Sequence, residues 1–293
     1  MPFSPPVVAV VGATGLLGAP VARRLHAEGH RVRALVRDVE SARRRLGNEI
    51  EYLRGSVSDD EAVDRLLGGA DAVHISLAAR DSGELDAIEH RGTARVARAA
   101  QRHGLRRITY LSGSLVHENY GEKIPEHRAK LAAERAIEAT GIPYTFFRPT
   151  YVTDNLPRHV QGPVALLFGR QRRVLHPIAA DDLAASVARA LVLPEAANRD
   201  FFLHGPEPIT LAEALRLYVA LVEPRARVVS VPVPLMSAID RLFLGGTLGP
   251  AIAITRLLQA LGERGDPEAA RAVLGAPQVS VRAWCEAQAG VSS

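Results

Sequence analysis

Three glycines spaced three residues apart follow directly on an apolar run near the N-terminus. The run covers residues 7–11 (VVAVV), and the glycines are Gly12, Gly15 and Gly18. A run this uniformly apolar does not alternate between a buried and an exposed face, which is typical of a parallel strand covered on both sides. The pattern therefore predicts a buried strand, a tight glycine turn and a helix that begins near Leu16.

Each glycine of this turn has its own physical role. Gly12 permits the tight turn, Gly15 lets the backbone approach a pyrophosphate, and Gly18 lets the helix pack closely on the sheet. The first N–H groups of the helix have no partner within it, so they can bind phosphates, with Thr14 and Leu16 in the turn itself. The motif indicates a dinucleotide site, and the alternative is a glycine turn that binds nothing.

The end of the second predicted strand indicates which dinucleotide is bound. Chains selective for NAD usually carry Asp or Glu there, which binds the ribose 2′-hydroxyl. Here the strand covers residues 31–36 and is followed by Arg37. A guanidinium suits a 2′-phosphate, so we expect NADP as the cofactor, although Asp38 places a carboxylate close by. Arg43 and Arg45 are expected to lie on a solvated helix face.

Composition and charge exclude several classes of protein. The chain has 293 residues, 47% hydrophobic and 23% charged, which is enough for one large or two intimate domains. Its net charge is +4, but the arginines are spread over predicted helices without a dense basic tract, so no nucleic acid partner is expected. The single cysteine, Cys285, excludes an internal disulfide and a multi-cysteine metal site, and no metal is expected. No segment is apolar for long enough to cross a membrane, which favours a cytoplasmic protein.

Strand and helix signals alternate through the first half of the chain. Further strands are predicted at residues 50–54, 72–77, 107–111 and 144–148, and helices at 16–28, 59–67, 85–103, 126–140 and 181–193. This alternation predicts a doubly wound parallel α/β sheet of the Rossmann type. We assign residues 1–150 to a nucleotide-binding domain, with residues 176–198 returning to it. The remaining residues, 151–175 and 199–293, are assigned to a smaller C-terminal lobe that binds the substrate.

Two serines and a lysine are candidates for the chemistry of hydride transfer. Such a reaction needs a polarised carbonyl and a source of protons. Ser112 and Ser114 follow the strand at residues 107–111, at the carboxyl edge where ligands bind in such sheets, and either hydroxyl could hold the substrate oxygen. Lys130, on the following helix, would orient the nicotinamide ribose, whereas Lys123 is expected to be solvated.

Together these features resemble the short-chain dehydrogenase/reductase superfamily, and more narrowly its atypical NmrA-like and extended branches. The resemblance rests on the glycine spacing, on Ser112 and Lys130, and on stretches such as residues 141–149 (GIPYTFFRP). It covers roughly residues 7–220. The resemblance implies an NAD(P)-binding fold and oxidoreductase chemistry, but its motifs are poor guides to the substrate.

The resemblance also implies further contacts to the cofactor. Ser56 and Val57 follow the third strand, where the superfamily binds the adenine, although it often has Asp at the first of these positions. Ser76, Leu77 and Ala78 end the fourth strand, beside the expected nicotinamide ribose.

The catalytic tyrosine of the superfamily is absent from its usual place. It lies four residues before the lysine, where this chain has Glu126. Three other groups are candidates for the proton donor: Tyr120 on a preceding loop, His127, whose ordinary pKa lies near neutrality, and Tyr151 after the sixth strand. Tyr151 could instead only line the pocket, and His127 could be exposed on the helix.

The sequence favours an NADPH-dependent oxidoreductase that reduces a small apolar carbonyl, enone or quinone. Ser114, Tyr151 and Asn155 would contact this small-molecule substrate. The chain is expected to be a monomer or homodimer without nucleic acid or membrane partners. Two alternatives remain: an NADP-binding redox sensor or regulatory protein without turnover, and a nucleotide-sugar epimerase or dehydratase, which normally needs the tyrosine.

Overall fold

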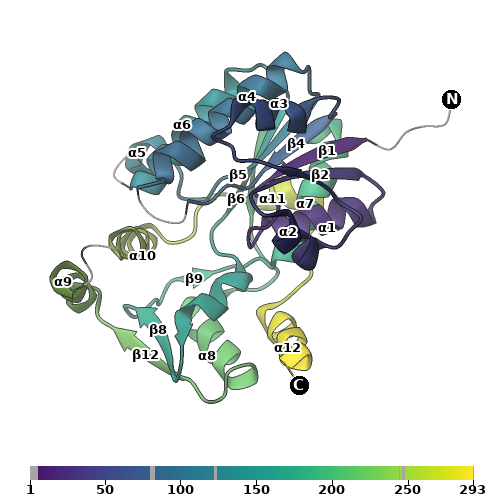
Figure 1. Cartoon of the computed structure of the whole chain (residues 1–293). Helices are drawn as coiled ribbons and strands as arrows, with labels where there is room; N and C mark the ends of the chain where they lie inside the picture. The colour runs from purple at the N-terminus through teal and green to yellow at the C-terminus, as the bar shows by residue number, and fades with distance from the viewer. Residues whose placement is uncertain (1–5, 80–82, 122–123, 244, 246–247, 293) are drawn as a thin grey trace.

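A seven-stranded sheet forms the centre of the protein in the computed structural model, which describes residues 6–79, 83–121, 124–243, 245 and 248–292 (Figure 1). The strands are β1 (Val7–Val11), β2 (Arg31–Val36), β3 (Glu51–Arg54), β4 (Ala72–Ile75), β5 (Arg107–Leu111), β6 (Tyr144–Pro149) and β10 (Arg199–Leu203). They lie in the order β10-β6-β5-β4-β1-β2-β3, and all neighbours are parallel. The predicted doubly wound sheet is confirmed, and its strand order reverses between β1 and β4.

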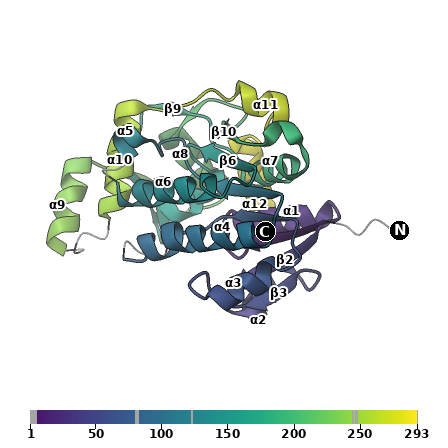
Figure 2. The same cartoon turned by 90° about the horizontal axis from the view of Figure 1, so that it is seen from above.

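Helices cover both faces of this sheet. One face carries α1 (Gly18–Ala27), α2 (Val39–Leu46), α7 (Ala180–Val192) and α11 (Glu268–Leu274), which share one buried apolar cluster with β1 and β2. The other face carries α3 (Asp60–Leu67), the π-helical η1 (Asp86–Gly92), α4 (Thr93–Arg102) and α6 (Pro125–Glu138). Helices α4 and α6 lie side by side (Figure 2).

Strand β1 is uniformly apolar because both of its faces are covered by helices. Val10 is completely buried, and every residue of β4 and β5 is buried as well. Polar side chains in these strands need partners inside the protein. His74 of β4 has one, since its Nδ1 lies 2.9 Å from Oγ1 of Thr109 in β5.

A separate core outside the sheet forms the C-terminal lobe. Leu167, Leu215 and Trp284 meet there, and the buried Cys285 packs among them. The elements of this part of the chain are η2 (Thr153–His159), β7 (Val160–Gln161), β8 (Val164–Phe168), β9 (Val174–Leu175), β11 (Ile209–Thr210), α8 (Leu211–Leu221), β12 (Arg227–Val231), α9 (Val233–Phe243), α10 (Gly249–Leu261) and α12 (Val281–Ser292). Strand β8 pairs with β7 and β12, and β9 pairs with β11. Two short helices, α5 (Glu118–Gly121) and η3 (Pro194–Ala196), lie elsewhere along the chain.

The chain returns to the main sheet after residue 199. Strand β10 pairs with β6 at the edge of the sheet, and Ala270 and Leu274 of α11 enter the core shared by α1 and α7. The predicted domain boundaries stay a prediction, but these two segments pack outside the core of the lobe. No helix in the described ranges combines the length and apolar character needed to cross a membrane.

We expect His74 to make the folded protein less stable in mild acid. Burial lowers the pKa of this completely buried ring to about 3. Below about pH 6.5 the unfolded chain binds a proton at this histidine and the folded chain does not, so stability is lost as the pH falls through that value. Between about pH 7.5 and about pH 5, the loss from this one group is about 2 kcal/mol.

Urea unfolding of the wild type and of His74→Asn at both pH values measures this contribution. The variant keeps a donor for Thr109 and cannot titrate, so its stability should vary less with pH by the same amount. An equal pH dependence in the two proteins contradicts the prediction.

Candidate cofactor and substrate site

The glycine turn between β1 and α1 has a backbone path that side chains would block. Gly12 has a φ of +84°, and a Cβ atom there would lie 2.2 Å from the carbonyl oxygen of Ser76. A Cβ atom on Gly18 would lie 2.2 Å from the carbonyl oxygen of Gly12. Gly15 donates its N–H to the same oxygen at 2.9 Å and is exposed. The turn is therefore a bare backbone cradle, which suits a pyrophosphate.

The helix that follows this cradle is left without a cap. The N-cap position of α1, Leu17, provides no side-chain hydrogen bond, and the first turn contains no acidic residue. In contrast, Asp38 caps α2 and Asp59 caps α3 through their carboxylates. Free N–H groups at a helix N-terminus attract an anion, so the end of α1 fits the phosphates of a dinucleotide. Thr14 and Leu16, both half-buried, complete the turn.

Arg37 lies exposed directly after β2, where a 2′-phosphate would be bound. Within the described ranges, its guanidinium makes no hydrogen bond or ion pair. The neighbouring Asp38 is already engaged, because its carboxylate accepts the N–H of Ser41 at 3.0 Å. Arg43 pairs with Glu40 at 2.9 Å on an exposed surface of α2, as a solvated helix face requires.

The residues expected near the adenine and the ribose lie at the carboxyl ends of β3 and β4. Val57 and Ser76 are buried, Ser56 and Leu77 are half-buried, and Ala78 is exposed. The N–H of Ser76 donates to the carbonyl of Val11 at 2.9 Å, which ties the end of β4 to the glycine turn. The turn, the free end of α1 and these strand ends fit a dinucleotide that runs across the sheet edge. The role of each residue stays a prediction.

A cavity of about 280 Å³ lies beside this edge of the sheet. Its walls come from the segments after β5 and β6, the first turns of α6, and Ile254 of α10. The structure brings nearly all predicted catalytic and substrate residues to this one cavity: Ser112, Ser114, His127, Lys130, Tyr151 and Asn155. Tyr120 belongs to α5, but its side chain lies outside the described part of the structure.

Lys130 is held by a buried carboxylate that the sequence did not single out. Its Nζ lies 3.2 Å from Oε2 of Glu89 in η1, while Oε1 of Glu89 accepts the N–H of Ala79 at 3.0 Å. Burial lowers the pKa of Lys130, but Tyr110, Glu89 and Glu126 together outweigh burial, so the net pKa is raised. The lysine is therefore a fixed positive charge at the cavity wall.

The two serines of the cavity differ in what their hydroxyls do. Ser112 donates to the carboxylate of Glu134, which also binds the guanidinium of Arg148 through two hydrogen bonds of 3.0 Å. Ser114 accepts a hydrogen bond of 2.9 Å from Thr150, so its own proton remains for a ligand. Ser114 is thus better placed than Ser112 to bind a substrate oxygen.

Helix α6 carries three charged residues at four-residue spacing, and this signal was available in the sequence. Glu126, Lys130 and Glu134 repeat every helical turn, so they share one face. Lys130 and Glu134 are buried, and Glu126 is half-buried at the cavity. A stripe of charge on the buried side of a helix indicates a site, and Glu134 could have been found in this way.

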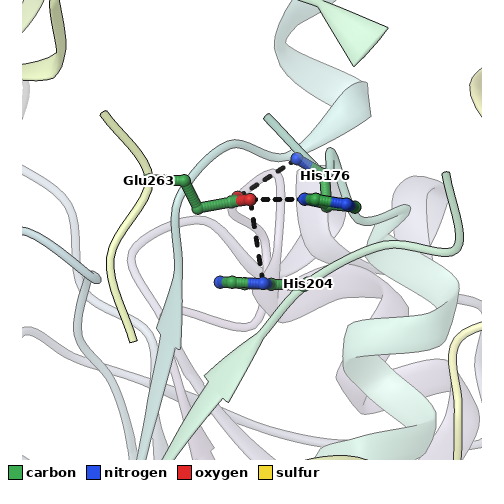
Figure 3. A group of neighbouring side chains, drawn as sticks. All are labelled: His176, His204 and Glu263. Carbon is green, nitrogen blue, oxygen red and sulfur yellow. Dashed lines mark hydrogen bonds and ion pairs between the residues drawn. The ribbon is translucent and has the colours of Figure 1, made fainter. Parts of the chain in front are cut away.

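A second polar cluster joins three distant segments of the chain (Figure 3). Glu263 accepts the backbone N–H of His176 at 3.1 Å, and its Oε2 lies 2.5 Å from Nδ1 of His176 and 3.7 Å from Nδ1 of His204. The two rings stack with an interplanar angle of 7°.

These three residues include the donor types that metals prefer, although no metal was expected from the sequence. A metal ion lies in the ring plane of each histidine that binds it. Stacked parallel rings do not direct their nitrogens to one common point, so the cluster as it lies suits a hydrogen-bonded clasp between segments. No spacing pattern could have revealed it, because His176 and Glu263 are 87 residues apart.

Comparison with known proteins gives a consistent family. The sequence model of a family described as NAD(P)H-binding matches residues 12–194. The (4-alkanoyl-5-oxo-2,5-dihydrofuran-3-yl)methyl phosphate reductase of Streptomyces griseus subsp. griseus is 34% identical over 215 residues, 71% of each chain. The photosystem II assembly factor Ycf39 of Trieres chinensis is 27% identical over 242 residues, which are 80% of this chain and 75% of that protein.

Among solved structures, the triphenylmethane reductase of Citrobacter sp. in complex with NADP(H) shares the fold. It superimposes with a TM-score of 0.71 over 97% of this chain and 99% of that one, at 24% identity. The shared architecture extends over the C-terminal lobe as well as the sheet.

We expect the buried pair of Glu134 and Arg148 to matter for stability. Both side chains are 8% exposed, so Glu134→Ala removes the buried partner of the Arg148 guanidinium and leaves it the exposed carboxylate of Asp200, 2.8 Å away. The free energy of unfolding should fall by about 2 kcal/mol, because a buried charge loses its two hydrogen bonds to Glu134. Glu138→Ala, at an exposed position one turn further along the same helix, is the control, with a change below about 1 kcal/mol. Denaturant unfolding of both variants decides this, and equal losses contradict it.

Proposed function

Because the chain belongs to the NAD(P)H-binding family, we propose that it is an NADPH-dependent reductase of a small apolar carbonyl, enone or quinone. The observation that carries the proposal is the cavity at the ends of β5 and β6, where the free hydroxyl of Ser114 and the fixed charge of Lys130 line one space. A hydroxyl donor and a cation in a confined space suit the oxygen of a carbonyl that gains negative charge.

The choice of NADPH over NADH is supported by the end of β2. Arg37 is exposed there and has no partner in the described structure, while Asp38 is engaged as a helix cap. The free guanidinium suits a 2′-phosphate, whereas Asp38 uses one of its carboxylate oxygens to cap α2. The fold relative from Citrobacter sp. was crystallised with NADP(H).

The residues of the cavity would act together on a bound substrate. A reduced nicotinamide, when bound, supplies the hydride. Ser114 would donate a hydrogen bond to the substrate oxygen, and Lys130 would stabilise negative charge nearby. Leu115, Val152 and Ile254 give the cavity apolar walls, which exclude water and strengthen these interactions.

The size of the cavity and the nature of one relative support a small conjugated substrate. A volume of about 280 Å³ accommodates a small molecule of one or two rings. The substrate named for the Streptomyces griseus relative contains a 5-oxo-2,5-dihydrofuran ring, in which a carbon–carbon double bond is conjugated to a carbonyl group. A similar activated alkene or a quinone fits this cavity.

A second candidate function is that of an NADP-binding protein without turnover. Two observations favour it: Glu126 stands at the place of the superfamily's tyrosine, and the relative from Trieres chinensis is an assembly factor by name. The reductase is preferred, because a non-catalytic sensor has no need for a cavity with a free hydroxyl and a fixed cation.

NADPH oxidation in the presence of quinones, enones, aldehydes and ketones tests the reductase proposal. We expect the wild type to reduce at least one conjugated substrate. We also expect it to bind NADPH tightly, as measured by the fluorescence of the nucleotide. Binding without any turnover across the panel would reject the reductase in favour of the second candidate. No binding of NADPH would reject both.

Arg37 should determine the preference for NADPH. Replacing it with alanine removes a charge-assisted contact to the 2′-phosphate, so the Kd for NADPH should rise about 10- to 100-fold and the Kd for NADH should change little. Arg43→Ala removes an equal charge from the same region and is the matched control. Titration of nucleotide fluorescence measures both constants. A similar rise for NADPH and NADH excludes the phosphate-binding role of Arg37.

A further inference from the structure

The reduction proposed above needs a proton donor at the substrate cavity. Most hydroxyl groups there already donate hydrogen bonds to other groups of the protein. Ser112 donates to Glu134, so its proton is held in the buried ion pair with Arg148. Lys130 is committed to Glu89 and keeps its charge. Neither group is free to release a proton to a substrate.

The tautomer of the neighbouring His159 excludes Tyr151 as the proton donor. Nδ1 of His159 lies 2.9 Å from the carbonyl oxygen of Leu166, which can only accept, so Nδ1 carries the ring proton. Burial lowers the pKa of His159, which keeps the ring neutral, and its Nε2 is then an acceptor. The hydroxyl of Tyr151, 3.1 Å from Nε2, donates to it, and its proton is thereby directed to His159.

His127 is a poor acid for a different reason. Its side chain is buried, and Nδ1 has no hydrogen-bond partner among the residues the structure describes. Burial lowers the pKa of His127 to about 4. The ring is therefore neutral near pH 7, and a neutral imidazole releases its N–H proton only at very high pH.

Among the described residues that line the cavity, Glu126 is the remaining acid. It lines the same cavity as Ser114 and lies one helical turn before Lys130, on the face of α6 that lines the cavity. Its carboxyl group is half-buried and makes no hydrogen bond within the described ranges. An acid with one side open to the cavity and no internal partner can reach a bound substrate.

The surroundings of Glu126 favour its protonated form. Burial, the largest influence, raises its pKa; Lys130 acts in the opposite direction, and the Glu89 carboxylate raises the pKa further. The positive charge of Lys130 is shared with Glu89, so it does not fully compensate burial. The other titratable groups along this cavity, His127 and Tyr151, are neutral near pH 7.

We propose that Glu126 is the catalytic proton donor of the reduction, in the place that a tyrosine holds in related enzymes. This rests on the reductase function proposed above. The π bond of the substrate carbonyl breaks, its carbon forms a C–H bond with the hydride, and its oxygen forms an O–H bond with the proton of Glu126. The cofactor is oxidised, and the Glu126 carboxylate recovers a proton from solvent.

Kinetics of Glu126→Gln, Glu126→Asp and Tyr120→Phe test this proposal on a substrate that the wild type reduces. We expect kcat of Glu126→Gln to fall about 100-fold or more, the usual contribution of a general acid. Glu126→Asp should keep part of the activity, and the loss in Tyr120→Phe should be smaller than that in Glu126→Gln. Glu138→Gln, an exposed site on the same helix, is the matched control.

Two readouts separate an acid from a structural role. The Kd for NADPH, measured by fluorescence, should be equal in the wild type and in Glu126→Gln. In the cofactor-free protein, infrared difference spectroscopy should detect a carboxyl group that titrates above the ordinary range of glutamate, and this band should be absent from Glu126→Gln. The wild-type kcat should fall as the pH rises through the same titration, because the acid form is required.

The outcomes distinguish this proposal from the reductase function itself. Retained kcat in Glu126→Gln, or an infrared titration in the ordinary range of glutamate, overturns the role of Glu126 and leaves the reductase intact. A large loss in Tyr120→Phe without one in Glu126→Gln assigns the proton to Tyr120 instead. A wild type that binds NADPH and reduces nothing overturns the reductase, and the proposal for Glu126 with it.

Discussion

The close contact between the glycine turn and the end of β4 is the constraint on which the site depends. Gly12 meets the carbonyl of Ser76 so closely that one methyl group would separate them. Because β1 and β4 are the strands at which the sheet order reverses, this contact places the uncapped end of α1 at the crossover. Ligands bind at such crossovers in open α/β sheets. The glycine turn and the cavity after β5 and β6 therefore lie at one edge of the sheet.

The sequence predicted the sheet far better than the lobe, and the reason is physical. A strand buried on both faces, such as β1, is recognised as a continuous apolar run, and each predicted strand of the first half lies in the sheet. In the lobe, β7, β9 and β11 have two residues each, which is too short for any periodic signal. Residues 199–203 were assigned to the lobe together with the rest of residues 199–293, yet the pairing of β10 with β6 is a long-range contact that local sequence does not reveal.

The site shows the same division. Positions at strand ends could be predicted, since topology alone brings Ser112, Ser114 and Tyr151 to one edge. Which of these hydroxyls is free depends on partners in other elements, such as Glu134 of α6 for Ser112 and His159 of η2 for Tyr151. Only the four-residue spacing on α6 carried a local sign of this network. No local sign in the sequence indicated that His176 and His204 would both lie beside Glu263.

The late return of the chain to the sheet has a consequence for synthesis on the ribosome. The first six strands emerge before β10, so β6 remains an unpaired edge until more than 200 residues have been made. The apolar cluster of α1 and α7 stays incomplete for longer still, until α11 has been made. An exposed parallel edge beside an incomplete core invites association between nascent chains. The nucleotide-binding half is thus completed by β10, which is translated after the first strands of the lobe, and by α11, which is translated after most of it.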